Sequence, residues 1–298
     1  MASPLVSILI PSYNRPDYLE MALRSALAQT YKNIEIIISD DSTNFQVRDR
    51  LVPYLSTHSN IKYIKNKKKL FVKNWIRCFA ASSGSYINYL MDDDLFHPQK
   101  IEEMMSMFMR FNDVSLVTSY RQLIDEKNEP RPGLQASRIF NQLSAVPGAA
   151  LGNYILTNGR NVVGEPTTVL FRKEALTEPF GVYHGKQYVF NNDLATWISL
   201  LSKGKAVYIP QELSSFRIHS GQNQHVPSII GTSFMEWTDL IVESRKDGFL
   251  RDPLQYRSAL YTQLQNMRLF LQQPRYTPFQ QNIQQVMQRI KLLLSKIE

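Results

Sequence analysis

The chain has 298 residues, of which 43% are hydrophobic and 20% charged, and its 34 Lys and Arg residues against 26 Asp and Glu give a formal net charge of +8. This length predicts one large or two modest globular domains with a sizeable core, and the single cysteine, Cys78, excludes an intrachain disulfide. The positive charge favours anionic partners, such as nucleotides, lipid headgroups or nucleic acid, without selecting among them.

A strand, a helix and a second strand are predicted at the start of the chain. Val6–Ile10 is a short aliphatic run, and Pro16 suits the first position of a helix. Ile34–Ile38 is a second aliphatic run, which is followed by Asp40 and Asp41. Such a βαβ unit places its two strands in parallel with a right-handed crossover.

A lysine run separates the third predicted strand from the next helix. After a helix over Phe45–Leu55 and a strand over Ile61–Ile64, the chain reads KNKKKLFVKNW, and a helix that carries Trp75 follows. Such a run is most often a solvated face. The alternative is that it steers a phosphorylated ligand toward nearby aspartates.

Three adjacent aspartates follow the fourth predicted strand. Tyr86–Met91 is typical of a buried strand, Asp92–Asp94 come directly after it, and Pro98 opens a helical pattern. Adjacent carboxylates repel one another at low dielectric, so they favour a bound hard divalent cation; the alternative is a solvated acidic turn. Because parallel strands end at one sheet edge, Asp40 and Asp41 should line the same crevice as this cluster.

The middle of the chain contains a helix that carries a further candidate carboxylate. This helix begins near Asn191 or Asn192, is capped near Gly204, and places Asp193 in its first turn. A carboxylate there also stabilises the helix dipole, which is the alternative to a functional role. The other predictions are strands over Val114–Tyr120, Val169–Phe171 and Ala206–Ile209, and a polar loop or hairpin over Asp125–Arg138.

Long helical patterns rich in Gln replace the strands from about Ser233. We therefore predict a domain over residues 1–232, with halves of about 1–110 and 111–232, and a helical C-terminal extension over residues 233–298. An apolar stripe from Ile283 to Ile297 fits a core or a subunit contact better than a membrane-surface helix. We expect the extension to mediate homo-oligomer formation or to close one side of the site.

Three segments, in this order along the chain, resemble the family 2 glycosyltransferases of the GT-A fold. They are VSILIPSYNRPDYLEMALRSALAQTYKNIEIIISDDST, GSYINYLMDDDLFHP and NNDLATWISLLSKGKAVYIPQELSSFRIHSG, and the resemblance covers about residues 4–223. It implies an α/β fold with a Rossmann-like, mostly parallel central sheet flanked by helices. A nucleotide-binding half would be followed by an acceptor-binding half. The implied activity is inverting transfer of a hexose from a UDP-sugar to a hydroxyl of a glycan or glycoconjugate.

The resemblance also implies a donor site at the ends of the first strands. Pro11 and Tyr13 would pack against the nucleotide base, and Asp41 would accept a hydrogen bond from uracil. Lys73 and Asn74 stand where the family often has an Arg-Asn pair near the donor. Further donor-site residues are Asn14, Arg15, Asp92 and Asp93, together with Glu165, which would contact the donor sugar or the acceptor, and Arg217, whose loop would close over the pyrophosphate.

A metal site is implied by the same resemblance. The family usually has an Asp where Met91 stands, which leaves Asp93 as the best ligand of Mn²⁺ or Mg²⁺, with Asp94 close by. His219 would contact the metal or a phosphate, although a lone histidine is more often structural. A divalent ion would stabilise the charge that gathers on the leaving diphosphate.

Asp193 matches the second residue of the family's Glu-Asp pair, the catalytic base, with Asn192 in place of the Glu. One carboxylate is enough for this chemistry, because an inverting transfer needs a single base within about 3 Å of the acceptor hydroxyl. The departures at Met91 and Asn192 leave a catalytically degenerate, nucleotide-sugar-binding protein as an alternative.

Two other classes of protein compete with this interpretation. A sugar nucleotidyltransferase would need a glycine-rich phosphate loop after the first strand, whereas PSYNRP contains no glycine. A nucleic-acid-binding protein would need a basic surface with interleaved aromatics and no acidic cleft, whereas the aspartates of this chain are predicted to line one crevice. We therefore expect no nucleic-acid partner.

The first residues and the hydropathy predict a soluble, cytoplasmic protein. Met1–Pro4 lacks the basic region of a secretion signal, the apolar run Leu5–Ile10 is too short, and no segment is long enough to span a bilayer. The single cysteine fits a reducing compartment. Peripheral contact with the inner face of the membrane is left open.

Overall fold

The computed structural model describes residues 3–131, 138–220, 227–273 and 280–297. Contacts divide the chain into two compact units. The first comprises Met1–Val146, Val163–Phe180 and Gly204–His219, and the second comprises Pro147–Val162, Gly181–Lys203 and Ser220–Glu298. Part of the predicted loop over Asp125–Arg138 lies outside the described residues.

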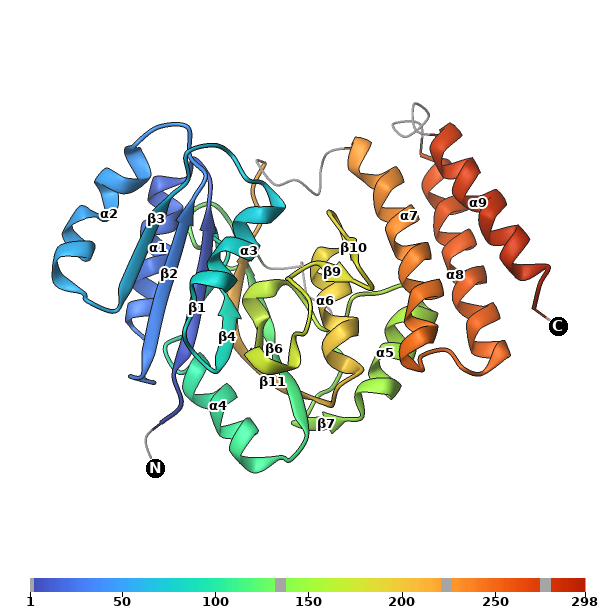
Figure 1. The fold of residues 1–298 in the computed structure, drawn as a ribbon, viewed down its shortest axis with the longest axis horizontal. Coiled ribbons are helices and arrows are strands. Elements are labelled where there is room, and N and C mark those ends of the chain that lie inside the picture. The colour runs from blue at the N-terminus through green and yellow to red at the C-terminus, as the bar shows by residue number, and fades with distance from the viewer. Residues whose placement is uncertain (1–2, 132–137, 221–226, 274–279, 298) are drawn as a thin grey trace. The chain divides into compact units, whose positions relative to one another are not determined.

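The first unit is built on a nine-stranded sheet with the order β3-β2-β1-β4-β8-β6-β11-β5, in which β7 pairs with β11. Figure 1 shows β3, β2, β1 and β4 side by side. Strands β3, β2, β1 and β4 are parallel neighbours, as are β6 and β11, whereas β8, β5 and β7 pair antiparallel. The strands are β1 (Val6–Ser12), β2 (Ile34–Asp40), β3 (Ile61–Lys65), β4 (Tyr86–Tyr89), β5 (Leu95–Phe96), β6 (Val114–Ile124), β7 (Ser144–Val146), β8 (Val169–Arg172) and β11 (Lys205–Arg217).

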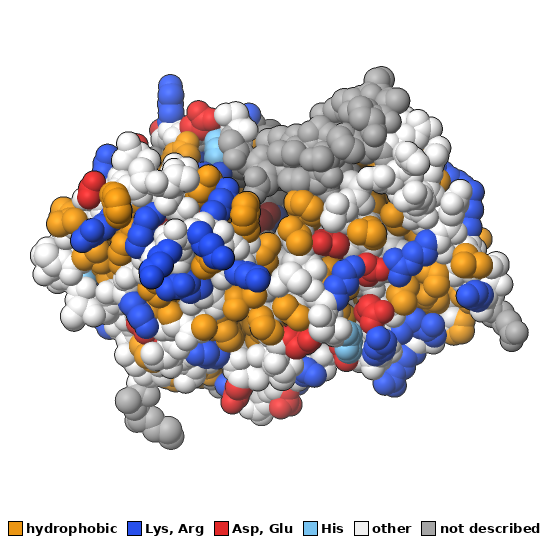
Figure 2. Space-filling view, turned by 45° about the horizontal axis from the view of Figure 1, so that its top comes forward, with side chains coloured by type: hydrophobic (Ala, Val, Ile, Leu, Met, Phe, Trp, Pro, Cys, Tyr) orange, Lys and Arg blue, Asp and Glu red, His pale blue; other side chains and the backbone are white. Residues whose placement is uncertain are grey.

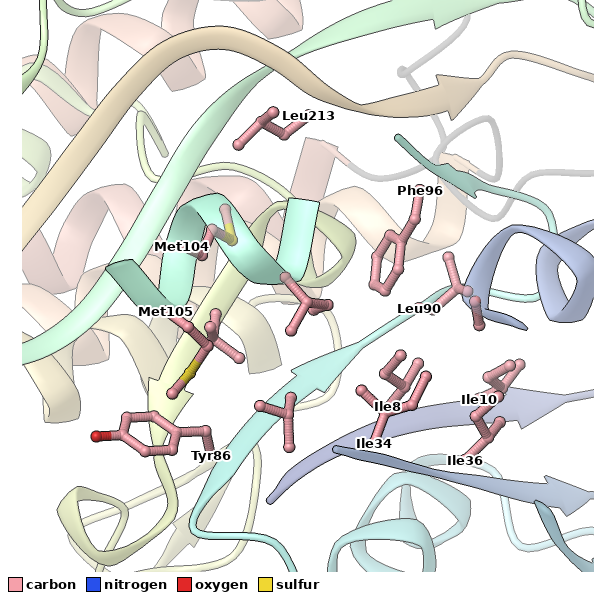
Figure 3. Packing of buried hydrophobic residues seen from close by; sticks show 14 of the residues in the cluster. Ile8, Ile10, Ile34, Ile36, Tyr86, Leu90, Phe96, Met104, Met105 and Leu213 are labelled. Carbon is pink, nitrogen blue, oxygen red and sulfur yellow. The ribbon is translucent and has the colours of Figure 1, made fainter. Parts of the chain in front are cut away.

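A hydrophobic core cluster lies on one face of this sheet. Its members on β1 and β2 are every second residue, because side chains alternate between the two faces along a strand. Ile8 and Ile10 of β1 and Ile36 of β2 join Phe96 and Met104 in one buried cluster (Figure 3). Each buried side chain of this size stabilises the fold by about 1.5–3 kcal/mol relative to exposure. The helices that contribute buried residues to this cluster are α1 (Pro16–Leu27), α2 (Gln46–Thr57) and α4 (Lys100–Arg110).

The opposite face of β1 and β2 is covered by α3 (Val72–Ala81). There the Tyr89 hydroxyl donates a hydrogen bond to the carbonyl of Trp75 at 3.0 Å. The rings of Trp75 and Phe180 stack with their centroids 5.1 Å apart. Both faces of β1 and β2 are thus buried, which explains their mostly aliphatic sequences.

Gly204 has a role other than the helix cap predicted for it. Ser202 is the C-cap of the preceding helix, α6 (Asn192–Leu201). A Cβ atom on Gly204 would lie 2.4 Å from the carbonyl oxygen of Asp113, at the start of β6. Glycine therefore permits the close approach of the two chain segments that precede β6 and β11.

The second unit is mainly helical. Helices α7, α8 and α9 pack against one another, and α5 packs against α6 and α8. Ile283, Val286, Ile290 and Leu294 of the predicted apolar stripe are buried within the chain, so the stripe is part of a core. The elements are α5 (Gly148–Asn158), β9 (Val182–Tyr183), β10 (Lys186–Gln187), α6, α7 (Pro227–Glu243), α8 (Pro253–Leu271) and α9 (Gln280–Leu294). Among the helices that can be described, none combines the length and the hydropathy needed to cross a bilayer.

Candidate functional site

The end of β1 lies between the two acidic clusters of the sequence. The Tyr13 amide donates to Oδ2 of Asp92 at 3.0 Å, and the Asp41 amide donates to the Ser12 carbonyl at 2.9 Å. Asn14 adds a brace, because its amide donates to the Ser42 hydroxyl at 2.8 Å. The carboxyl ends of β1, β2 and β4 thus bring both clusters to one sheet edge, where ligands bind in open α/β sheets.

Asp41 is held by the loop that follows β3. Its Oδ1 accepts from Nδ2 of Asn66 at 2.7 Å, and its Oδ2 accepts from the amides of Leu70 and Phe71 at 2.8 and 3.0 Å. The same Nδ2 of Asn66 lies 2.9 Å from Oδ1 of Asn74. The carboxylate predicted to contact uracil therefore also fixes the shape of residues 66–71. Sequence reasoning missed Asn66, although its position directly after a strand matches that of Asp41.

Aromatic rings and a lysine surround the same loop. Nζ of Lys69 lies 3.6 Å from the ring centroid of Tyr13 and 4.7 Å from that of Phe71. Phe71 is 67% exposed and has φ 54°, a backbone conformation that favours glycine. Pro11 is buried, whereas Lys73 is exposed. Figure 2 shows a group of Lys and Arg side chains interspersed with exposed hydrophobic ones on one face.

Arg15 and His219 both contact the acidic loop after β4. Nη1 of Arg15 lies 3.1 Å from Oδ1 of Asp92 and 2.6 Å from Oδ2 of Asp93. Nε2 of His219 lies 2.9 Å from the same Oδ2 of Asp93. Burial, helped by the charge of Asp93 and opposed by Arg15, raises the pKa of Asp92 to about 7.

Asp94 faces the interior instead. It is fully buried, and its two oxygens accept from the Thr167 hydroxyl at 2.5 Å and from the Arg217 amide at 3.0 Å. Burial raises the pKa of Asp94 well above its ordinary value, with the charge of Asp93 as a second cause. These contacts favour a structural role for Asp94 over the metal-ligand role predicted for it. Thr167, which sequence reasoning missed, has no local signal that would have identified it.

Arg217 is a fully buried guanidinium that holds the acidic loop from behind. Its Nε donates to the Asp93 carbonyl at 2.7 Å, its Nη1 to the Asp125 carbonyl at 2.7 Å, and its Nη2 to Oδ1 of Asn128 at 2.6 Å. It also lies over the Tyr18 ring, 4.7 Å from the centroid. These hydrogen bonds favour a role of Arg217 in positioning Asp93, rather than the contact with the pyrophosphate that was predicted for Arg217.

Glu165 forms an ion pair with Arg121. Nη2 of Arg121 donates to Oε1 of Glu165 at 2.7 Å, and Nε lies beside Oε2. Glu165 immediately precedes the short 3₁₀ helix Pro166–Thr168, from which Thr167 reaches Asp94. Contacts of the acidic loop thus reach from Arg15 to Thr167, two residues from Glu165.

A divalent ion fits part of this arrangement. Oδ2 of Asp93 and Nε2 of His219 are an oxygen and a nitrogen that can both ligate Mn²⁺, and donor phosphates would supply further oxygens. Arg15 places its own cationic group beside the same oxygen. No group of three or more His, Cys, Asp and Glu side chains suited to a metal ion occurs in the part of the chain that is described.

Asp193 lies in the first turn of α6, as predicted. This helix belongs to the second unit. Oδ1 of Asp193 accepts from the Leu194 amide at 2.7 Å, and its Oδ2 accepts from Nδ2 of Asn161 at 3.1 Å. Asn192, the neighbour that replaces a carboxylate, turns its Oδ1 to the Asp193 amide at 2.7 Å. The contact from Asn161 was missed, because nothing in the segment GRNVVG distinguishes that residue.

Comparison with known proteins identifies the family. The model of "Glycosyl transferase family 2" matches residues 7–178, which is more than half of the chain. The chain belongs to this family. The resemblance drawn from the sequence motifs is therefore confirmed.

Relatives of this family 2 chain occur in several bacteria. An uncharacterized glycosyltransferase of Rickettsia conorii is 31% identical over 229 residues, which are 73% of this chain and 33% of the relative. One from Nostoc is 28% identical over 240 residues, 78% of this chain and 70% of the relative. The chain thus spans only a third of the length of the Rickettsia conorii relative.

Solved structures confirm the predicted fold class of this family 2 chain. S. aureus TarS, residues 1–349 in complex with UDP-GlcNAc, has a TM-score of 0.62 at 12% identity, covering 87% of this chain and 80% of that one. The same TarS segment in complex with UDP gives a TM-score of 0.57 at 15% identity. At these identities the similarity shows the fold.

Proposed function

We propose that the chain is a metal-dependent, inverting glycosyltransferase that moves a sugar from a UDP-sugar to a hydroxyl of a glycan or glycoconjugate. The observation that carries this proposal is the arrangement at the end of β1, where Asp41 and its loop lie on one side and Arg15, Asp92 and Asp93 on the other, in a family 2 chain. The UDP and UDP-GlcNAc complexes of TarS support a uridine donor.

The donor nucleotide would bind at the Asp41 side. The Tyr13 ring, 37% exposed, offers a surface for the base, and Asp41 offers carboxylate oxygens that a uracil N–H can share with the loop amides. Lys69, which lies between the rings of Tyr13 and Phe71, would move toward the phosphates. The nearby lysine run raises the local concentration of anionic donor.

The diphosphate would lie beside Arg15, Asp93 and His219. Asp93 and His219 are the residues that would hold Mn²⁺ or Mg²⁺, and the bound ion would neutralise the charge that develops on the departing diphosphate. Arg15 would shift from the Asp93 carboxylate toward a phosphate, where a guanidinium binds in bidentate fashion. Arg217 would keep the Asp93 backbone in place from the buried side.

Asp193 would act as the general base. Its carboxylate would remove the proton from the acceptor hydroxyl as that oxygen attacks the anomeric carbon from the face opposite the leaving UDP. The hydrogen bonds from Asn161 and from the Leu194 amide restrict the orientation of the carboxylate, which supports such a role.

The test is to measure thermal shift and UDP release with UDP-GlcNAc, UDP-Glc, UDP-GalNAc and UDP-Gal, with Mn²⁺ and with EDTA. We expect at least one donor to raise the melting temperature and to release UDP in Mn²⁺ only, because a ligand that binds the folded state stabilises it by mass action. Absence of both effects with every donor would overturn the proposal.

A nucleotide-sugar-binding protein without turnover is the second candidate function. Met91 and Asn192 stand where the family usually has carboxylates, which is the observation that favours it. Donor-induced stabilisation without any UDP release, also with added glycan acceptors, would identify this case. Cytoplasmic location, contact with the inner face of the membrane, and self-association through the C-terminal helices stay predictions.

A further inference from the structure

A buried carboxylate from the C-terminal helices binds the segment that leads into α6. Glu236 on α7 is 3% exposed. Its Oε1 accepts from the Val189 amide at 2.7 Å, and its Oε2 accepts from the amides of Phe190 and Asn191 at 3.0 and 2.9 Å. One side chain thus satisfies three consecutive backbone N–H groups that lie 45 to 47 residues away in sequence.

These contacts add to the local caps of α6, in which the side chains of Asn192 and Asp193 accept from the amides of Asp193 and Leu194. The first N–H groups of a helix have no intrahelical acceptor, and a side chain at the N-cap usually supplies one. In α6 the N-cap residue, Asn191, makes no such bond. Glu236 accepts from the N-cap amide instead, and its negative charge lies at the positive end of the helix dipole. Burial of a carboxylate costs free energy unless hydrogen-bond donors are present, so Glu236 depends on these three amides to remain buried.

Ser233, one turn earlier on α7, fixes the side chain of the same N-cap residue. The Ser233 carbonyl accepts from Nδ2 of Asn191 at 2.8 Å, and its hydroxyl donates to Oδ1 of Asn191 at 3.3 Å. Residues three apart share one face of a helix, so Ser233 and Glu236 act from the same side. Together they hold residues 189–191 by backbone and by side chain.

Asp193 follows this held segment by two residues. The Ala195 amide donates to the Asn191 carbonyl at 2.9 Å, so Asp193 lies within the first turn that Asn191 opens. With the Asp193 backbone fixed from α7, Asn161 and the Leu194 amide can orient its carboxylate. A shift of the helix start would move the carboxylate relative to Asn161, which lies on a separate segment of the chain.

We infer that Glu236 is a positioning residue for Asp193, so that the C-terminal helices contribute to the transfer step. This inference rests on the proposed function, in which Asp193 is the base. Glu236 lies beyond residues 7–178, the part of the chain that the family model matches. The extension then acts within one chain and does not require self-association.

The test compares Glu236→Gln with Glu243→Gln, a matched loss of charge on the same helix, where Glu243 pairs with Lys246 on the surface. Steady-state UDP release is measured with the donor that the wild-type protein hydrolyses fastest. The amide of Gln presents N–H groups to backbone N–H donors, so we expect kcat of E236Q to fall at least about tenfold while the donor KM changes less than about twofold. E243Q should match the wild type.

Asn191→Ala is a second variant, which removes the side-chain contacts with Ser233 and keeps the backbone contacts of Glu236. We expect it to lower kcat by about threefold or more at unchanged donor KM, while amide hydrogen exchange of residues 189–194 rises in both E236Q and N191A. Wild-type kcat in both variants, or equal losses in kcat and donor binding, would overturn the inference. Absence of UDP release from the wild-type protein would instead contradict the proposed function.

Discussion

His219 and Asp93 lie 126 residues apart in sequence, yet Nε2 of His219 is 2.9 Å from Oδ2 of Asp93. The sheet explains the contact. Leu95 and Phe96 of β5 pair antiparallel with Ser215 and Ser214 of β11, so the chain after the acidic loop runs back along the strand that leads to His219. A loop at the end of one strand is thereby brought to a residue beyond the end of another.

The first prediction concerns Asp93. Asp93→Asn removes the charge shared by Arg15 and His219, and we expect the dissociation constant of UDP in Mn²⁺ to rise at least about tenfold, as for loss of a metal ligand or its partner. In EDTA the two proteins should bind UDP equally weakly. Titration calorimetry measures both, with the exposed Asp49→Asn as the control. Equal affinity in Mn²⁺ would remove Asp93 from the donor site.

The second prediction separates two roles for Arg217. If its guanidinium holds the acidic loop, Arg217→Lys loses the bonds to the carbonyls of Asp93 and Asp125, and the free energy of unfolding falls by about 1–3 kcal/mol. Urea denaturation measures this change, and the exposed Arg77→Lys should leave it unchanged. A variant of normal stability with weak UDP binding would point to a direct pyrophosphate contact instead.

The third prediction uses Phe71, whose φ of 54° is unfavourable for a bulky residue. Phe71→Gly relieves that strain, so we expect the free energy of unfolding to rise by about 1 kcal/mol. If the exposed ring stacks on the donor, UDP affinity should fall by about three- to tenfold. Denaturation and calorimetry are run side by side, with Phe45→Ala, also exposed, as the control. Unchanged UDP affinity would contradict stacking of the ring on the donor, and lower stability would contradict relief of backbone strain.

The fourth prediction is a pH dependence of stability that comes from Lys100. This lysine is fully buried, with Nζ 3.1 Å from the Thr168 carbonyl, and burial lowers its pKa well below 10.5. Between the lowered pKa and 10.5 the unfolded chain binds one more proton at Lys100 than the folded chain. The contribution of Lys100 to the free energy of unfolding therefore rises with pH in this window and is lost as pH falls.

Lys100→Met removes that contribution at similar side-chain volume. We expect the variant to be more stable than the wild type at about pH 7. The free energy of unfolding of the wild type should rise with pH by up to about 1.36 kcal/mol per pH unit from Lys100, and that of the variant should lack this rise. Urea unfolding at about pH 7 and about pH 9 measures it, with the exposed Lys67→Met as the control. Parallel pH profiles of K100M and wild type would contradict the assignment.

The parts of the fold that local patterns encode were predictable from sequence. Val6–Ile10 and Ile34–Ile38 are buried on both faces, so their continuous aliphatic runs identified them as parallel strands. The shared location of the aspartates that follow parallel strands was also predictable, because parallel strands end at the same edge of a sheet. By contrast β11 extends to Arg217, far beyond the predicted Ala206–Ile209, because its polar second half is stabilised by pairing with β6 and β5.

Side-chain roles that depend on distant partners could not be predicted. The three adjacent aspartates are equivalent in sequence. Asp94 nevertheless points inward, because the Thr167 hydroxyl and the Arg217 amide donate hydrogen bonds to it there. Glu236 looks like any acidic residue of an amphipathic helix, and only its contact with residues 189–191 distinguishes it. Long-range pairing of this kind leaves no periodic trace in the chain.

The most direct test of the central claim, that Asp193 is the general base of a UDP-sugar transfer, is to measure UDP release and UDP binding of Asp193→Asn in Mn²⁺. We expect UDP to bind within about twofold of wild type while the rate of UDP release falls by about 10²–10⁴-fold, the range that general-base catalysis contributes. A variant that releases UDP within about threefold of the wild-type rate would contradict the claim.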